Sequence, residues 1–163
     1  MEPTFWRTEI YHPLSVHFPI ALLLVATLAK AATLLLKDAN YRFWQRVGSY
    51  LLYAGCVAAW FSIYTGDLAD GIVSRKICDP TVLKDHENAA FTLAYLFTAA
   101  TALDLFLAFR LIRMREKMLH LLVVVLMLAG SAFLMYTGHL GARVVYEQAG
   151  GVNVPASDCA GFE

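Results

Sequence analysis

Four long apolar runs constrain the fold of this chain more than any other feature of its sequence. They cover Leu14–Leu36, Val47–Gly66, Glu87–Phe109 and Leu119–Leu140. A bilayer core of about 30 Å is crossed by roughly 20 helical residues, and each run is long enough. Charged residues make up 16% of the chain, against about 25% in soluble domains. The sequence therefore predicts an all-α fold of four transmembrane helices in contact with the lipid bilayer.

The two halves of the chain repeat each other. Ile63–Val73 reads IYTGDLADGIV and Met135–Val145 reads MYTGHLGARVV, with five of eleven positions identical. Upstream of each lies a histidine followed by a long apolar run, beginning at His17 and at His86. Short links within each half favour antiparallel neighbours. We expect a single domain over residues 1–163, an up-down bundle of two tandem hairpins related by a pseudo-twofold axis along the membrane normal.

Charge is sorted between the two sides of the predicted bundle. The net charge is zero, so the chain has no basic field for nucleic acid. Basic residues gather in the two short links: Lys37, Arg42, Arg46, Arg110, Arg113, Arg115 and Lys117. Most acidic residues lie instead in the N-terminal segment, the 67–85 loop and the 141–163 tail. The positive-inside rule then predicts that both termini and this loop lie on the outer side.

The cysteines fit this orientation. Cys78 and Cys159 both lie in predicted outer segments, and an oxidising compartment permits a disulfide between them. Such a bridge would pin the loop to the tail, whereas the alternative is two unrelated exposed thiols. Cys56 lies inside the second apolar run and is expected to be a small buried residue.

Both hairpins are expected to begin with a capped helix that carries a histidine. Ser15 is a suitable cap for the first helix, with Pro19 in its first turn. Asp85 is a suitable cap for the third helix, with His86 as its first residue. The positive end of a helix dipole disfavours imidazolium. His17 and His86 should therefore be neutral, which is the form that binds metal.

Histidines gather at the outer end of the predicted bundle. Four of the five lie there, and the fifth, His120, lies at the inner end. The repeat pairs His17 with His86, and Asp67 with His139. Ionisable groups at membrane depth are costly and usually functional. The candidate site consists of His12, His17, His86 and His139.

The first functional hypothesis is a membrane cytochrome subunit that binds haem b, one or two per chain. His17 and His86 would be axial ligands from facing helices, with His12 and His139 as further ligands or partners. Aromatic residues near these positions suit a porphyrin: Phe18, Trp60, Tyr64, Phe91 and Tyr136. Arg143 or free helix N–H groups would meet the propionates. Such a subunit would exchange electrons with quinone or quinol, other redox subunits or a periplasmic cytochrome, rather than act as a stand-alone enzyme.

Two alternatives remain open. One is a non-haem site for zinc, iron or copper, built from His17, Asp67, His86 and His139. The other is a non-catalytic membrane subunit that anchors a larger respiratory complex and uses its histidines for packing. Tyr64 and Tyr136 also suit an aromatic belt at the membrane interface. Asp104, near the inner end, is expected to pair with Lys30 or a link arginine.

Three motifs carry a resemblance to a known family. They are HPLSVHFPIALL at His12–Leu23, DHENAAF at Asp85–Phe91, and YTGHLGARVVYEQAGGVNV at Tyr136–Val154. With them the chain resembles a bacterial family of predicted membrane proteins, domain of unknown function 2231, over nearly its whole length. The resemblance implies four helices with outward-facing histidines and a frequent association with respiratory or redox genes. Together with the charge distribution, it leads us to expect a bacterial inner-membrane protein with periplasmic termini. It implies no established activity.

Overall fold

The regular structure of the chain is helical wherever it is described. The computed structural model describes residues 7–109 and 115–152. Its elements, in chain order, are the 3-10 helix η1 (Thr8–Ile10), α1 (Tyr11–Ser15), α2 (His17–Ala32), α3 (Asp38–Val73), α4 (Pro80–Ala108) and α5 (Glu116–Tyr146). Four helical stretches are long and apolar enough to cross a membrane, the first combining η1, α1 and α2. The prediction of an all-α fold with four candidate spans is confirmed.

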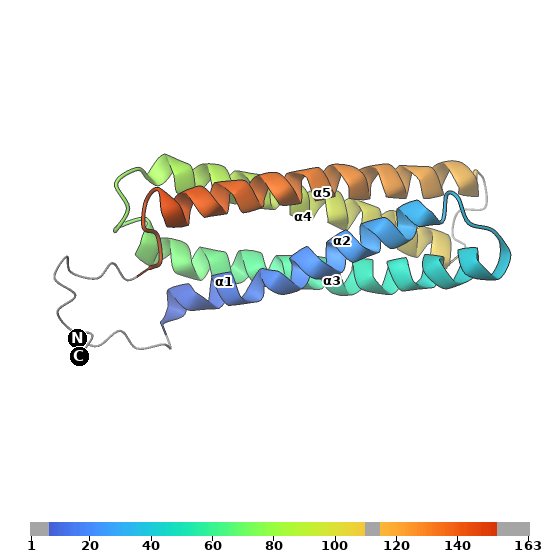
Figure 1. The fold of residues 1–163 in the computed structure, drawn as a ribbon, viewed down its shortest axis with the longest axis horizontal. Helices are drawn as coiled ribbons and strands as arrows, with labels where there is room; N and C mark the ends of the chain where they lie inside the picture. Colours follow the sequence, from blue (N-terminus) through green and yellow to red (C-terminus); the bar gives the residue numbers. More distant parts are fainter. Residues whose placement is uncertain (1–6, 110–114, 153–163) are drawn as a thin grey trace.

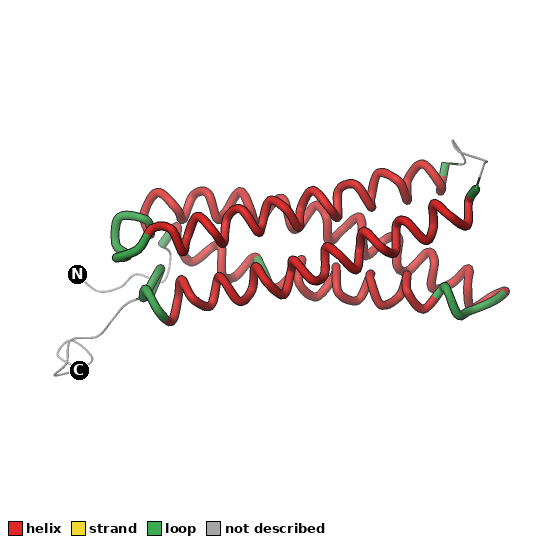
Figure 2. The backbone as a smooth tube through the Cα atoms, turned by 90° about the horizontal axis from the view of Figure 1, so that it is seen from above, coloured by secondary structure: helices red, strands yellow, loops and turns green. Residues whose placement is uncertain are grey.

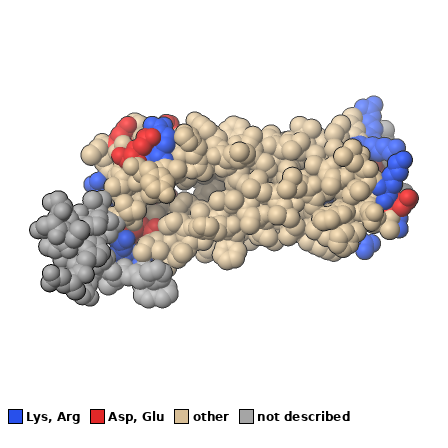
Figure 3. Space-filling view, viewed as in Figure 1, with Lys and Arg blue, Asp and Glu red and all other residues tan. Residues whose placement is uncertain are grey.

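The four long helices form one bundle of two antiparallel hairpins (Figures 1 and 2). Each helix packs on two others, in the cyclic order α2, α3, α4, α5. Helices α2 and α4 therefore face each other across one diagonal, and α3 and α5 across the other. We call the end with η1 and the α3–α4 loop the terminal end. The opposite end, where Lys and Arg gather in Figure 3, is the basic end.

The helices extend further than the apolar runs predict. Helix α3 continues to Val73 and α5 to Tyr146, so the expected 67–85 loop shrinks to residues 74–79. With 36 residues, α3 is about 54 Å long at 1.5 Å per residue. It therefore exceeds the hydrocarbon core. The hydrophobic runs marked the membrane-spanning parts, but helices do not end where hydropathy falls.

The predicted cap of the third helix is wrong by almost two turns. Helix α4 begins at Pro80, and Asp79 is its N-cap, accepting hydrogen bonds from the Thr81 amide at 3.0 Å and hydroxyl at 2.6 Å. The Thr81 hydroxyl, followed by its amide, holds the pKa of Asp79 below its ordinary value. Proline is favoured just inside a helix start because its missing N–H needs no partner there. His86 therefore lies within α4, and Asp85 is an exposed helical residue.

Ser15 does not cap the first span either. Helical structure already begins at Thr8 and is interrupted at Val16. Pro19 lacks an N–H to donate to the Ser15 carbonyl four residues back, which accounts for the break. The Ser15 hydroxyl lies 3.0 Å from the His12 carbonyl and 2.9 Å from Thr65 Oγ1. Buried at this junction, it ties α1 to α3.

Two glycines set the close packing within the hairpins. A Cβ on Gly55 of α3 would lie 2.7 Å from Leu23 of α2, and one on Gly130 of α5 would lie 2.8 Å from Phe97 of α4. Small residues let membrane helices approach closely. Leu23 and Phe97 are both fully buried at the centre of the core.

Candidate functional site

The imidazoles of His12 and His86 meet at the terminal end of the bundle. Their ring centroids are 5.9 Å apart, and the rings are inclined at 80° in an edge-to-face contact. His12 comes from α1 and His86 from α4. The pair therefore spans one diagonal of the bundle and joins the two hairpins.

The two histidines form equivalent hydrogen bonds, each from Nδ1 to a backbone carbonyl. His12 Nδ1 lies 2.9 Å from the carbonyl oxygen of Ser62, and His86 Nδ1 lies 3.0 Å from that of Thr137. Because a carbonyl oxygen can only accept, Nδ1 carries the proton and donates in each ring. Nε2 of each neutral imidazole then keeps its lone pair. A metal-ligating histidine commonly donates its other ring N–H in this way.

A glycine one turn after each acceptor makes room for the ring. Gly66 follows Ser62, and Gly141 follows Thr137, by four residues. A Cβ on Gly66 would lie 3.1 Å from His12 Nδ1, and a Cβ on Gly141 would lie 3.1 Å from His86 Cε1. Helices α3 and α5 therefore each present a backbone carbonyl and a glycine to one imidazole, which comes from the other helical segment of the same hairpin.

The pairing differs from the one that the sequence repeat predicts. His12 and His86 are separated along the chain by the same 74 residues as Lys30 and Asp104. The acceptors Ser62 and Thr137 are separated by one residue more. The identical YTG triplets are closer in sequence than this, so they occupy positions about one helical turn out of register. Sequence identity detected the duplication, but it misaligned the copies.

The other predicted site residues lie apart from this pair. His17 is exposed, with Nδ1 3.4 Å from the Leu14 carbonyl, and His139 and Asp67 are exposed as well. Among residues 7–109 and 115–152, no three His, Cys, Asp or Glu side chains gather in a way that could hold a metal ion. The expected four-ligand set is therefore not brought together.

The structure describes Arg143 but only one of the two predicted disulfide partners. Cys78 is exposed in the α3–α4 loop, whereas Cys159 lies outside the described residues. Cys56 is buried, as expected. The Arg143 guanidinium already binds Glu147, with Nε 3.0 Å from the carboxylate.

Three aromatic residues pack together near the histidine pair. Trp60 of α3 precedes Ser62 by two residues, and Phe91 and Tyr95 of α4 follow His86 by five and nine residues. Trp60 contacts the rings of Phe91 and Tyr95 edge to face, and its Nε1 donates to Thr98 Oγ1 at 2.9 Å. The predicted porphyrin neighbours Phe18, Tyr64 and Tyr136 are largely exposed instead. Figure 3 shows a hollow between the two hairpins, nearer the terminal end than the basic end.

One polar atom beside the pair has no partner in the described part of the chain. Ser62 Oγ is buried and forms no hydrogen bond there, although the Ser62 carbonyl holds His12. A buried hydroxyl without a partner is costly. A bound group or an ordered water would satisfy it.

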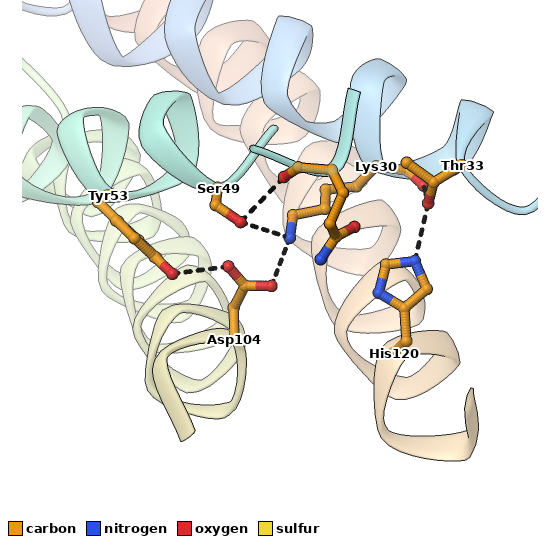
Figure 4. A network of polar contacts seen from close by, with 7 residues as sticks. Lys30, Thr33, Ser49, Tyr53, Asp104 and His120 are labelled. Carbon is orange, nitrogen blue, oxygen red and sulfur yellow. Dashed lines mark hydrogen bonds and ion pairs between the residues drawn. The ribbon is translucent and has the colours of Figure 1, made fainter. Parts of the chain in front are cut away.

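A second polar cluster lies toward the basic end (Figure 4). The Lys30 ammonium forms a fully buried ion pair with Asp104 and also donates to Ser49 Oγ at 2.8 Å. The Tyr53 hydroxyl donates to the other carboxylate oxygen at 2.8 Å. The Lys30–Asp104 pairing was expected, whereas the roles of Ser49 and Tyr53 were missed. Both are ordinary residues in sequence and become distinctive only by facing a buried charge.

His120 belongs to this end of the bundle but not to the ion pair. Its Nε2 lies 2.7 Å from Thr33 Oγ1, and Tyr41 contacts its ring edge to face. These contacts join the start of α5 to the end of α2 and the start of α3. A structural role for His120 agrees with its separation from the other histidines.

Comparison with known proteins identifies a family without an assigned activity. The family model described as a predicted membrane protein, DUF2231, matches residues 10–154. No curated protein and no solved structure matches the chain. The match covers both histidines of the pair and all four candidate spans, except for the first two residues of the first span.

Proposed function

The chain belongs to the DUF2231 family of predicted membrane proteins, and we propose that it is a b-type haem-binding subunit for electron transfer. His12 and His86 are the proposed axial ligands. One observation carries this proposal: two imidazoles meet across the bundle, and each has Nδ1 bound to a helix carbonyl and Nε2 left for a ligand. This changes the sequence-based assignment, in which His17 was the partner of His86.

The donor set fits haem better than a non-haem metal site. A structural zinc site takes four protein ligands and a catalytic one takes three, whereas a haem iron needs only two axial ligands from the protein. Two imidazoles on one metal atom have ring centres about 6 Å apart, given metal–nitrogen bonds of about 2.0–2.1 Å. The 5.9 Å between His12 and His86 is close to this value and supports ligation of one metal atom by both rings, whereas the number of protein ligands favours haem.

The protein's contribution is to fix the ligands before binding. The Ser62 and Thr137 carbonyls hold each ring in one tautomer, and donation from Nδ1 raises the basicity of Nε2. Gly66 and Gly141 set how deeply the rings sit against α3 and α5. A haem with both axial positions filled would supply reversible one-electron transfer. The buried Ser62 hydroxyl is available to donate to a bound group.

The position of the pair suggests the partners. The histidines lie at the terminal end, and the positive-inside rule assigns the basic end to the cytoplasm. We infer that the site lies near the periplasmic face of a bacterial inner membrane. Electrons would then be exchanged with quinol at the interface or with a periplasmic or membrane redox partner. A cofactor at one face does not by itself carry electrons across about 30 Å of hydrocarbon.

Visible spectra of the protein purified in detergent test this proposal. We expect a Soret band with sharp α and β bands after reduction. His12→Ala and His86→Ala should each abolish the reduced spectrum, whereas His17→Ala and His139→Ala should retain it. These controls remove exposed histidines from the same end of the bundle. A folded, colourless and metal-free protein would refute the proposal and favour a non-catalytic anchor. Loss of haem from His17→Ala but not from His12→Ala would restore the sequence-based pairing.

A further inference from the structure

The two hairpins present nearly equivalent faces to each other, which raises the question of how each selects its partner. Leu23 over Gly55 in the first hairpin corresponds to Phe97 over Gly130 in the second. His12 likewise corresponds to His86. A face that accepts a similar hairpin also suits the like hairpin of a second copy of this chain, because isologous surfaces are self-complementary.

Lys30 and Asp104 are the positions where this equivalence breaks. They occupy corresponding sites, 74 residues apart, yet they carry opposite charges. Both are fully buried, and they bind each other across the α2–α4 diagonal. If two first hairpins paired, Lys30 would meet a second Lys30. If two second hairpins paired, Asp104 would meet a second Asp104. A buried charge without its partner is strongly unfavourable.

The hydroxyl groups that bind the Lys30–Asp104 pair come only from the first hairpin within the described residues. The first hairpin supplies Ser49 and Tyr53, which bind the ammonium and the carboxylate. Positions of α3 correspond to positions of α5 with the same offset that relates Ser62 to Thr137. The residues that correspond to Ser49 and Tyr53 are therefore Val124 and Leu128. Val124 is buried and apolar, so the second hairpin lacks hydroxyls for a like pair of carboxylates.

The space is also fitted to these two side chains. A Cβ on Gly48 would lie 2.8 Å from Lys30 Cγ. The long Lys30 side chain therefore occupies space that any side chain at position 48 would fill. The residue of α5 that corresponds to Gly48 is Val123, which is fully buried. Helix α5 packs beside α4, which carries the shorter Asp104. Charge, hydrogen bonding and volume thus all distinguish the first hairpin from the second.

We propose that the Lys30–Asp104 pair selects the hairpin partner: it joins the two hairpins of one chain and rejects the like hairpin of a second copy. Buried ionic groups can specify a partner even where apolar residues would be equally stable. This function does not depend on haem binding, so it stands or fails separately from the proposed electron transfer.

Co-expression of two differently tagged chains tests the proposal. Lys30→Asp places carboxylates at both sites, and Asp104→Lys places ammonium groups at both. Each variant alone should give poorly folded or aggregated protein. Expressed together, they should exchange hairpins and co-purify as a domain-swapped heterodimer, several-fold above a mixture of two wild-type tags. Two variants that each remain as monodisperse as the wild type, or that show no enrichment, would refute the proposal.

A neutral variant separates selection from stability. Lys30→Met/Asp104→Leu replaces the pair by apolar residues and should retain helical content in detergent. It should nevertheless co-purify with differently tagged copies of itself more than the wild type does. If this folded variant excludes second copies as well as the wild type does, the ion pair does not select the partner. If it does not fold, the pair is required for folding itself, which also contradicts the proposal.

Discussion

His12 and His86 meet edge to face with ring centroids 5.9 Å apart, although they lie 74 positions apart in the chain and the YTG repeat does not align them. Each ring lies on a glycine of the neighbouring helix and donates to a carbonyl one turn earlier. The duplicated hairpin thus builds the same half-site twice. The two half-sites meet where the hairpins face each other.

Adding a methyl group to the half-site glycines should disturb the ligands. In Gly66→Ala and Gly141→Ala the new Cβ would lie 3.1 Å from an imidazole atom, so each ring must shift from its carbonyl. We expect weaker haem retention, measured as the ratio of Soret to protein absorbance. Gly71→Ala and Gly138→Ala are matched controls, because a Cβ there meets nothing within 4 Å. Equal retention in all four variants would contradict the half-site description.

Neutralising one member of the buried ion pair should cost far more than neutralising an exposed acid. Asp104→Asn leaves the Lys30 ammonium without its counterion, and breaking a buried pair costs about 3–5 kcal/mol. Tyr53→Phe removes one hydrogen bond to the same carboxylate, worth about 1 kcal/mol within a membrane bundle. Unfolding in detergent mixtures with increasing SDS gives both values. Glu116→Gln, at the exposed start of α5, should change little, and an Asp104→Asn variant as stable as this control would contradict the prediction.

The start of α4 should be sensitive to acid. Hydrogen bonds from Thr81 lower the pKa of Asp79 in the folded protein. The Asp79 carboxylate therefore stabilises the start of α4 at pH values above the pKa that Asp79 has in the unfolded chain. This contribution is lost as the pH falls below the ordinary carboxyl range near about 4. The protection factor of the amides in the first turn of α4, taken relative to the intrinsic exchange rate at each pH, should fall several-fold at low pH. Asp79→Ala should show the lower protection factor at every pH. If protection in that variant still falls with pH as it does in the wild type, the effect belongs to another group.

The orientation can be measured with the chain's own cysteine. Cys78 is exposed in the α3–α4 loop, which the charge distribution assigns to the outer side. In intact cells, a Cys159→Ala variant should react at Cys78 with a membrane-impermeant maleimide. Lys117→Cys, in a variant that also carries Cys78→Ala and Cys159→Ala, should react only after the membrane is permeabilised. The reverse pattern would invert the topology and move the histidine pair to the cytoplasmic face.

The length of the apolar runs and the cap residues are local features of the sequence, and they predict local features of the structure. Apolar length predicted four spans, because hydrocarbon demands satisfied backbone over a fixed thickness. Helix ends were predicted less well. The Asp79–Pro80 start of α4 is readable from cap and proline preferences, but the apolar pattern drew attention to Asp85. Helix α3 runs on to Val73 beyond the apolar run, and Val73 is buried there in a second small cluster with Ile77, Val82 and Val144.

Hydropathy, charge sorting and repetition in the sequence determined a duplicated, four-span helical chain with histidines at one end. Which histidines meet was decided by the tertiary structure alone. The partner of His86 changes from His17 to His12, five residues earlier in the chain, and the identity around YTG does not detect this change of register. The packing of Leu23 on Gly55 and of Phe97 on Gly130 fixes the register within each hairpin, and the Lys30–Asp104 pair links the two hairpins. These contacts form only between helices, so no local pattern contains them.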